Sequence, residues 1–329
     1  MKTFERILVP TDFSGKASEA YPFAQKIAEK FDARIDFIHI IPMTQYFSES
    51  IKKLGVPFDM EEDLFPHVIE RARDQIQEIM SEHIEEDYRG DSYVQIHRKP
   101  SEAISDYARQ HKYDLILMGA KGEHESDLLR GSVTEKVIRH SRVPVLSIEG
   151  TWPQQGIQHI LMPTDTSDMS YASLPYVASL AHFFGADITL LNVIELYGSL
   201  SESIPHDPGE SEMEAIYENI INHAKSYFED NGYDNIKIKR GDKTYEDELV
   251  INNDQSETIP LHTRIHKGVS AHYGIEEVAT ENDIDLLVMS THGRTGLAHI
   301  FLGSTTENVA KYVHRPVLTI RPPKESFES

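Results

Sequence analysis

The sequence predicts two similar α/β domains in tandem, each built on a five-stranded parallel sheet. The first observation is an internal repeat, because residues 5–42 align with residues 158–195 without a gap. The second is that short, nearly all-apolar segments alternate with segments whose apolar residues recur with a helical period. This alternation is typical of a parallel sheet that is covered by helices on both faces. The chain has 329 residues, which is enough for two ordinary domains.

The repeat extends over most of the chain. YDLILMGAKG (113–122) matches IDLLVMSTHG (284–293), and GSVTEKVIRHSRVPVLSI (131–148) matches GSTTENVAKYVHRPVLTI (303–320). Such a long period indicates a duplicated domain and not a solenoid.

The two predicted domains are residues 1–150 and residues 156–323, and the link between them carries proline, glycine and the only tryptophan. The second domain contains 18 additional residues before its glycine loop. We place most of them in an inserted, solvent-exposed hairpin around 235–260. A surface extension is the simpler interpretation of this insertion, and a partner or ligand site is the alternative.

The helices and strands of the first domain are predicted from the spacing of apolar residues and from proline and serine at helix starts. Those of the second domain are predicted in the same order. A helix comes after the first strand because its apolar residues fall on one face. A longer helix is predicted around 64–83 with Pro66 in its first turn. Ser101 is predicted to cap the next helix, and Ser132 lies near the start of the last. The predicted strands are RILVP, RIDFIHII, YVQIH, DLILM and VPVLSI.

A ligand site is expected where the strand order reverses. In a doubly wound sheet ordered 3-2-1-4-5, that point lies beyond the carboxyl ends of strands one and four. The residues there are PTD (10–12 and 163–165) and GAKG (119–122) or STHG (290–293). The strand order therefore predicts that the two best-matched tips of each repeat face each other.

The residue types at these tips suit a nucleotide. An aspartate at a strand tip can accept hydrogen bonds from ribose hydroxyls or a base amine. Glycines let backbone N–H groups approach phosphate oxygens and adopt positive φ. A Gly-Ser pair that opens a helix adds further N–H donors and the positive end of the helix dipole. The alternative is a capping carboxylate with ordinary turn glycines, but duplication and opposed placement favour a site. The sequence has neither a GxxxxGKS/T motif nor a GxGxxG motif after the first strand, which argues against a P-loop ATPase and the usual dinucleotide fold.

The amino-acid composition argues against some classes of binding partner. Lys and Arg number 32 against 54 Asp and Glu, a formal net charge of −22, which argues against nucleic acid and against an anionic membrane surface. The absence of cysteine excludes disulfides and thiolate metal sites. We find no signal core and no apolar run of about 18 residues, so we expect a cytoplasmic protein.

The quoted residues resemble the universal stress protein family over nearly the whole chain, as two tandem copies. Nucleotide-binding members of that family carry G-x2-G-x9-G-S/T after strand four, an aspartate at the tip of strand one, and a PVL last strand. The resemblance implies a Rossmann-like fold of the adenine-nucleotide α-hydrolase type and ATP binding, often without appreciable turnover. It also implies pairing through the last strands, here VPVLSI with RPVLTI in an intramolecular pseudo-dimer, with a homodimer as a further option.

The first copy departs from the family pattern. Gly119, Gly122, Gly131 and Ser132 are present, but eight residues separate the second and third glycines where the pattern has nine. This segment also carries carboxylates that would repel phosphates: Glu123, Glu125 and Asp127. We therefore predict that the first domain binds nucleotide weakly or is a structural partner.

The second copy keeps the nine-residue spacing and has no acidic residue in it. It differs from the family pattern in having Ser290 in place of the first glycine. If positive φ were required there, serine would adopt it at a higher conformational energy than glycine. We predict that the second domain is the main ATP site. Arg294 in this loop could meet a phosphate. The resemblance implies that Asp165 contacts ribose or adenine, that Val193 lies near the base, and that the phosphates are held by Gly293, Gly303, Ser304 and Thr305. The counterparts in the first half are Asp12, Ile40, Gly119, Gly122, Gly131 and Ser132.

The histidines carry weaker signals. His262, His266 and His272 could form a metal site, but no carboxylate cluster at ligand spacing supports one. His292 lies in the second glycine loop, where a purely structural place in the loop or contact with a ligand is favoured over acid–base catalysis. Mg²⁺ could accompany the triphosphate without a dedicated protein site.

The favoured function is a cytoplasmic stress-response protein that binds ATP and acts as a sensor or regulatory module through an unknown protein partner. We assign no catalytic residue, because no general base or metal-binding carboxylate pair stands out near the glycine loop. The alternatives are a slow ATPase and a nucleotide-free scaffold or small-ligand carrier.

Overall fold

The computed structural model describes the chain except residues 44–64, 121–131, 197–208, 253–255, 294–301 and 324–329. The chain divides into two compact units. The first unit comprises residues 4–152, and the second comprises residues 153–329 together with residues 1–3.

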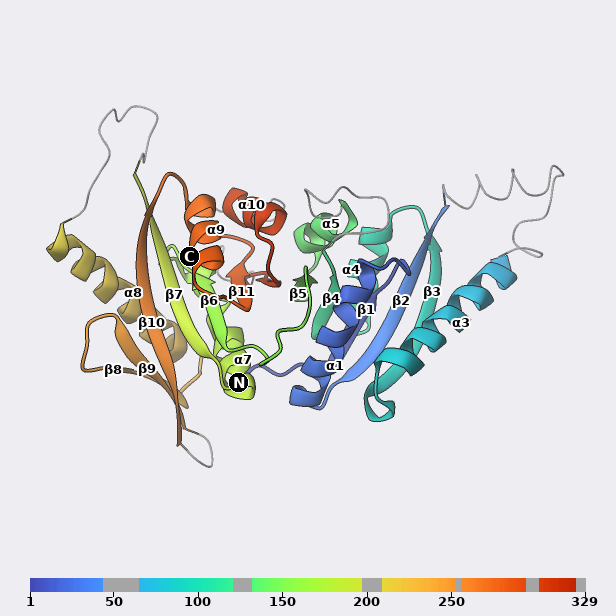
Figure 1. Ribbon diagram of the computed structural model, residues 1–329, viewed down its shortest axis with the longest axis horizontal. Helices are drawn as coiled ribbons and strands as arrows, with labels where there is room; N and C mark the ends of the chain where they lie inside the picture. The colour runs from blue at the N-terminus through green and yellow to red at the C-terminus, as the bar shows by residue number, and fades with distance from the viewer. Residues whose placement is uncertain (44–64, 121–131, 197–208, 253–255, 294–301, 324–329) are drawn as a thin grey trace. The chain divides into compact units, whose positions relative to one another are not determined.

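The first unit has a parallel sheet with the strand order β3-β2-β1-β4-β5 (Figure 1). This is the predicted order 3-2-1-4-5, and the α/β fold class is confirmed. Its described elements are β1 (Arg6–Pro10), η1 (Ala17–Glu19), α1 (Ala20–Phe31), β2 (Arg34–Pro42), α3 (Phe65–His83), η3 (Glu86–Tyr88), β3 (Arg89–His97), α4 (Pro100–Gln110), β4 (Leu115–Gly119), α5 (Ser132–His140) and β5 (Val145–Ile148).

The helices of the first unit follow the apolar pattern, with one correction. Phe23 and Ile27 of α1 are each only 1% exposed, as their helical spacing predicts. The prediction that Ser101 caps α4 is wrong. The helix begins at Pro100, and the N-cap is Lys99, whose side chain makes no capping bond. Proline suits the first helical position, so the helix starts one residue before the serine, which is buried instead.

The second unit repeats the same five parallel strands and extends them. Its order is β12-β11-β6-β7-β10-β9-β8, in which β9 is antiparallel to both β10 and β8. Its described elements are β6 (His159–Pro163), α6 (Asp168–Tyr171), α7 (Leu174–Phe184), β7 (Asp187–Glu195), α8 (Glu210–Asp230), β8 (Ile236–Arg240), β9 (Glu246–Asn252), β10 (Ser256–Gly268), α9 (Ala271–Glu281), β11 (Leu286–Ser290), α10 (Ser304–Tyr312) and β12 (Val317–Ile320).

The insertion forms a hairpin, but it is not the solvent-exposed excursion expected from its polar middle. β8 and β9 pair antiparallel, and β9 joins the sheet beside β10. Ile238 is 8% exposed, and Leu249 and Ile251 are fully buried. Helix α8 packs against β8 and β10 and contributes the buried side chains of Tyr217 and Ile221. The alternation of isoleucine and lysine in β8 therefore marks a half-buried strand, with the isoleucines facing a core.

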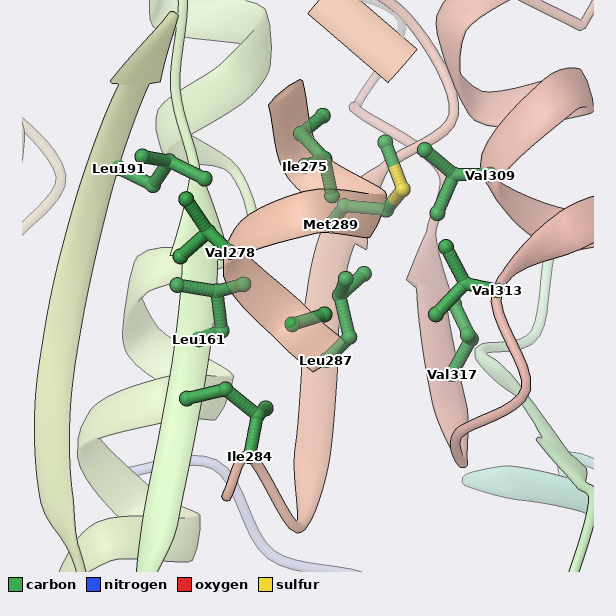
Figure 2. Close-up of a cluster of buried hydrophobic side chains, with 11 residues drawn as sticks. Leu161, Leu191, Ile275, Val278, Ile284, Leu287, Met289, Val309, Val313 and Val317 are labelled. Atoms are coloured by element: carbon green, nitrogen blue, oxygen red, sulfur yellow. The ribbon is translucent and has the colours of Figure 1, made fainter. Parts of the chain in front are cut away.

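One core cluster fixes the helices nearest the predicted site. Figure 2 shows leucine and valine side chains of β6, β7, β11 and β12 packed against Ile275 and Val278 of α9, Val309 of α10 and Val313 just after that helix. This packing holds α10 against the sheet, so the first turn of that helix lies at the carboxyl end of β11. No helix in the described part of the chain is long and apolar enough to cross a bilayer.

Candidate functional site

The turn after β6 holds Asp165 in a fixed orientation. Its Oδ1 atom accepts hydrogen bonds from the Ser167 N–H at 3.0 Å and from the Ser167 hydroxyl at 2.6 Å. Thr166, between them, has a φ of +66°. The Ser167 hydroxyl also accepts from the Ser170 N–H at 3.2 Å and so caps α6. A short hydrogen-bonded turn therefore presents the carboxylate at the tip of the strand.

The neighbouring strand tip approaches this carboxylate closely. β11 pairs with β6, so their carboxyl ends lie side by side. A Cβ atom added to Gly293 would overlap Oδ2 of Asp165. The structure thus brings together two predicted site residues from separate strands, and only glycine fits at 293 without displacing the carboxylate.

The start of α10 is tied to the same strand tip. The Gly303 N–H donates to the Thr291 carbonyl at 2.9 Å, and the Thr306 hydroxyl donates to the Ser290 carbonyl at 2.9 Å. No side chain caps α10, whose N-cap is Gly303. The first N–H groups of a helix have no partner within the helix, and this end carries the positive pole of the dipole. Ser304, the first residue of the helix, is exposed.

The glycines are required by close approach and not by positive φ, which corrects one expectation. Neither Gly293 nor Gly303 has a positive φ. A Cβ on Gly303 would lie 3.2 Å from the Thr291 carbonyl oxygen. The φ of Ser290 is not positive either, so serine carries no backbone strain there. Its side chain is buried, and its hydroxyl accepts from the His292 N–H at 3.3 Å.

Val193 lies at the carboxyl end of β7, the strand next to β6. Its half-buried side chain packs against the core cluster of Figure 2. A Cβ on Gly274 would lie 2.7 Å from Val193 Cγ1, and one on Gly268 would lie 3.3 Å from it. The contacts described for Val193 are thus with the start of α9 and the end of β10. Arg294 lies outside the described residues.

The first unit repeats the turn geometry. Asp12 Oδ1 accepts from the Ser14 N–H at 3.1 Å and from the Ser14 hydroxyl at 2.6 Å, and Phe13 has a φ of +67°. Asp12 is exposed, whereas Asp165 is half-buried.

The β4 tip of the first unit is also tightly packed. A Cβ on Gly119 would lie 2.6 Å from the Lys16 carbonyl oxygen, and the Thr134 hydroxyl donates to the Gly119 carbonyl at 2.9 Å. Ser132 is the first residue of α5, and Ile40 is 7% exposed in β2. Gly122, Gly131 and the acidic residues between them lie outside the described residues.

Each repeat has a second side chain that fixes the strand-one tip and that the sequence analysis missed. His39 Nδ1 lies 2.8 Å from the Thr11 carbonyl oxygen, and Asn192 Nδ2 donates to the Thr164 carbonyl at 2.9 Å. His39 and Asn192 occupy matching positions of the repeat. Burial lowers the pKa of His39, so its ring is neutral at pH 7 with Nδ1–H as the donor. The Phe13 ring packs on this imidazole at 4.4 Å between centroids.

Residues that fix the strand tips could have been identified from the alignment of the two repeats, because several of them are identical at matching positions. Thr11 and Thr164 match, and so do Thr134 and Thr306. The Thr11 hydroxyl is bonded to the Tyr21 hydroxyl at 2.6 Å, and burial raises the pKa of Tyr21 to about 12. Each of these threonines makes a hydrogen bond at a strand tip. Their identity in the two repeats was therefore the sequence feature that pointed to this structural role.

The histidines singled out from the sequence have separate partners. His266 Nε2 lies 3.1 Å from a Glu277 carboxylate oxygen, and His272 Nδ1 lies 3.0 Å from the Ser270 hydroxyl. His292 is buried, and its Nδ1 lies 2.8 Å from the Thr291 hydroxyl. In the part of the chain that the structure describes, no group of three or more His, Asp or Glu side chains is arranged to hold a metal ion.

Comparisons with known proteins match both halves of the chain. The model of the universal stress protein family matches residues 3–148 and again residues 156–321. A universal stress protein of Methanocaldococcus jannaschii is 29% identical over 166 residues, covering 50% of this chain and 83% of that protein. The universal stress protein E homolog of Haemophilus influenzae is 24% identical over 335 residues, covering 98% of this chain and 99% of that protein.

Solved structures agree at the level of the fold. The crystal structure of a universal stress protein from Archaeoglobus fulgidus superimposes with a TM-score of 0.60 at 18% identity, covering 96% of this chain and 98% of that one. Because the family model matches each half in turn, the chain belongs to the universal stress protein family, as a member with two such domains in tandem.

Proposed function

We propose that this chain is a stress-response protein that binds an adenine nucleotide, ATP, mainly through its second unit and acts as a sensor or regulatory module. The observation that carries the proposal is the close approach of Gly293 to the Asp165 carboxylate, beside the uncapped start of α10. A carboxylate and a helix N-terminus at neighbouring strand tips match the two chemically different ends of a nucleotide.

The carboxylate suits the ribose end. A carboxylate has about four lone-pair sites on its two oxygens, so Asp165 can accept from a sugar hydroxyl while Oδ1 is held by Ser167. Val193, at the end of the next strand, offers an apolar surface for the base, as the family resemblance implies. The ribose and the base would thus lie across β6 and β7.

The start of α10 suits the phosphates. The N–H groups of Ser304 and Thr305 lie in the first turn, where negative charge is favoured by the dipole. Glycine at 293 and at 303 removes the side chains that would stand between a phosphate and these donors. Arg294 would supply a positive charge from the same loop. Mg²⁺, if it accompanies the triphosphate, would be held chiefly by phosphate oxygens and water.

We infer binding without appreciable turnover. Among the described residues of the glycine loop, the titratable side chain is that of His292, which is buried and hydrogen-bonded to Thr291. Glu307, in the first turn of α10, is paired with Lys311 at 2.7 Å. Neither arrangement suits a general base for an attacking water, so we assign no catalytic residue. The output would pass through a protein partner, in the cytoplasm.

The first unit is assigned weak binding or a structural role. Its loop is one residue shorter than that of the second unit and contains Glu123, Glu125 and Asp127. Three carboxylates beside the phosphate position would oppose a triphosphate by charge repulsion. The pairing of VPVLSI with RPVLTI stays part of this proposal.

The test is to denature the purified protein, remove it by centrifugation, and identify released small molecules by ultraviolet absorbance and mass. A single adenine nucleotide per chain supports one competent site, and two would show that the first unit also binds. If no nucleotide is released and calorimetry detects no ATP binding, the result favours a nucleotide-free scaffold or a small-ligand carrier. Phosphate release with and without Mg²⁺ separates binding from slow hydrolysis.

A further inference from the structure

β3 is a long edge strand whose outer side has no described partner strand. It is nine residues long, and within the described residues it pairs only with β2. Every residue of β3 is at least partly exposed, including the large side chains of Tyr93, Val94 and Ile96. Exposed edge strands of this length pair readily with another chain unless something covers or blocks them.

The second repeat covers part of the same edge with its own chain. Its third strand, β10, corresponds to β3, and β9 pairs antiparallel along its outer side from Ser256 to His262, which by register corresponds to residues 85–91. Ile259 and Leu261 of β10 are buried as a result of this cover and of α8. The fold therefore accepts an antiparallel strand at this edge, and the first repeat has no equivalent insertion.

The sequence around β3 is charge-complementary to itself. Residues 85–99 read EEDYRGDSYVQIHRK, with acidic residues before the strand and basic residues after it. If two copies pair antiparallel about Ser92, the acidic flank at Glu85 and Glu86, at the η3 turn before the strand, comes near the basic flank at Arg98 and Lys99 just beyond it. All four of these charged side chains are exposed. Attraction between the oppositely charged flanks favours this pairing, and a two-fold axis brings the two flanks together twice.

The outermost strand of the second unit has the reverse property. β8 carries exposed Lys237 and Lys239 on either side of Ile238. Two copies of β8 that paired about Ile238 would bring these lysines directly opposite each other, and like charges in that position are destabilising. Lysines on an edge strand are a common block to pairing. The two edge strands thus differ in whether they tolerate a second copy.

We infer that a second copy of this chain pairs with β3 by antiparallel strand addition about a two-fold axis at Ser92. Main-chain hydrogen bonds supply the attraction, and the charged flanks set the register. This dimer is independent of nucleotide binding, because β3 contributes none of the residues assigned to the nucleotide.

A charge exchange tests the partner and the orientation together. The first variant, Glu85→Lys with Glu86→Lys, makes both flanks basic, and the second, Arg98→Glu with Lys99→Glu, makes both acidic. Wild-type protein should sediment as a dimer that weakens with salt. Each variant alone should be monomeric, and an equimolar mixture should form a heterodimer. Wild-type protein that is monomeric at all concentrations, or variants that dimerise like wild type, would overturn the inference.

The matched control is Lys237→Glu with Lys239→Glu on β8, which should leave the dimer unchanged. All substituted side chains are exposed, so circular dichroism should show native secondary structure in every variant. Loss of the dimer in the control would assign the interface to β8 and contradict the pairing at β3.

A cross-link tests the register. The natural chain has no cysteine, so Ser92→Cys introduces a single thiol that lies opposite its own copy. Mild oxidation should give a disulfide-linked dimer. Val94→Cys would be offset from its own copy by four residues, about 13 Å along the strand, which is beyond disulfide reach. Cross-linking of Val94→Cys as fast as Ser92→Cys, or of neither, would contradict the two-fold axis at Ser92.

Discussion

Asp165 and Gly293, which come from separate strand tips, lie in direct contact at the carboxyl end of the second unit's sheet. The carboxylate cannot simply turn away, because Ser167 holds its Oδ1 atom through two hydrogen bonds. The turn after β6 and the loop after β11 are thus coupled through one carboxylate. A substitution at either residue should therefore change the position of the other.

Gly293→Ala should displace the Asp165 carboxylate and weaken ATP binding. Overpacking of this kind costs typically 1–3 kcal/mol in stability. In an Asp165→Ala background the added methyl group has room, so the stability cost of Gly293→Ala should largely vanish. Thermal unfolding of the four proteins of this cycle measures the coupling. Additive effects would show that the two residues do not touch in solution. Gly15→Ala, where no atom lies within 4 Å of the new Cβ, is the neutral control.

Gly303→Val should abolish ATP binding while the protein still folds, with a small loss of stability because the new Cβ would lie 3.2 Å from the Thr291 carbonyl oxygen. Gly303 has φ −59° and ψ 139°, a conformation open to any residue, so backbone strain is not expected. The valine side chain would stand at the first turn of α10, where the phosphates are proposed to sit. Calorimetry with ATP measures the loss. Gly131→Val makes the same change in the first repeat and should leave binding unchanged; the opposite ranking of the two variants would place the main site in the first unit.

Asp165→Ala should weaken ATP binding by roughly 1–3 kcal/mol, or about 5- to 150-fold in Kd, as for loss of a hydrogen bond to a charged group. Asp12→Ala removes the matching carboxylate of the first unit and should leave binding unchanged. Ser167→Ala keeps the carboxylate but removes one of its hydrogen bonds, so its effect should be smaller. Equal affinity of all three variants would mean that no ribose lies at Asp165.

The repeat and the apolar pattern were enough to predict the strand order and the opposed tips. They could not reveal why glycine is required at 293, because that depends on a contact with a residue far away in the sequence. Pattern alone suggested positive φ, and the structure shows close approach instead. The prediction that the inserted hairpin is solvent-exposed was wrong for a similar reason, because its burial depends on another part of the chain. The cover over Ile236 and Ile238 comes from α8, and no local feature of β8 indicates it.

The two repeats also diverged where local pattern gives little warning. Asp36 is 1% exposed, and its Oδ2 atom accepts from the Tyr113 hydroxyl at 2.6 Å and from Arg6 Nη2 at 3.0 Å. The matching positions of the second repeat are Thr189 and Ile284, so the aspartate–tyrosine pair is specific to the first repeat. In the sequence, Asp36 merely looks like one polar residue in an apolar strand.

Tyr113→Phe should destabilise the first unit by about 1–3 kcal/mol, because a buried carboxylate loses one of its hydrogen-bond donors. Burial and the bond to Asp36 raise the pKa of Tyr113, so the hydroxyl stays protonated and donates throughout the neutral range. Chemical denaturation followed by tyrosine fluorescence measures the change. Tyr273→Phe is the control, since that side chain is 59% exposed and should change little. Equal stability of the two variants would show that the Asp36 network contributes nothing.

His39→Asn should remove part of the acid sensitivity of the first unit. Burial lowers the pKa of His39 below its ordinary value of 6.5. As pH falls below about 6.5, the unfolded chain therefore takes up a proton before the folded chain does, and stability declines until the pH reaches the folded-state pKa. Asparagine occupies the matching position of the second repeat and makes the same bond to a strand-tip carbonyl, through Asn192 to Thr164.

The variant should thus fold and keep the bond to Thr11, while its loss of stability between about pH 7.5 and about pH 5.5 should be smaller than in the wild type. The residual slope then belongs to the other titratable groups of the chain, among them its remaining histidines and its carboxylates. Urea unfolding at both pH values measures the difference directly. The same slope in both proteins would mean that His39 titrates alike in the folded and unfolded states, and that its contact with Thr11 does not depend on the neutral ring.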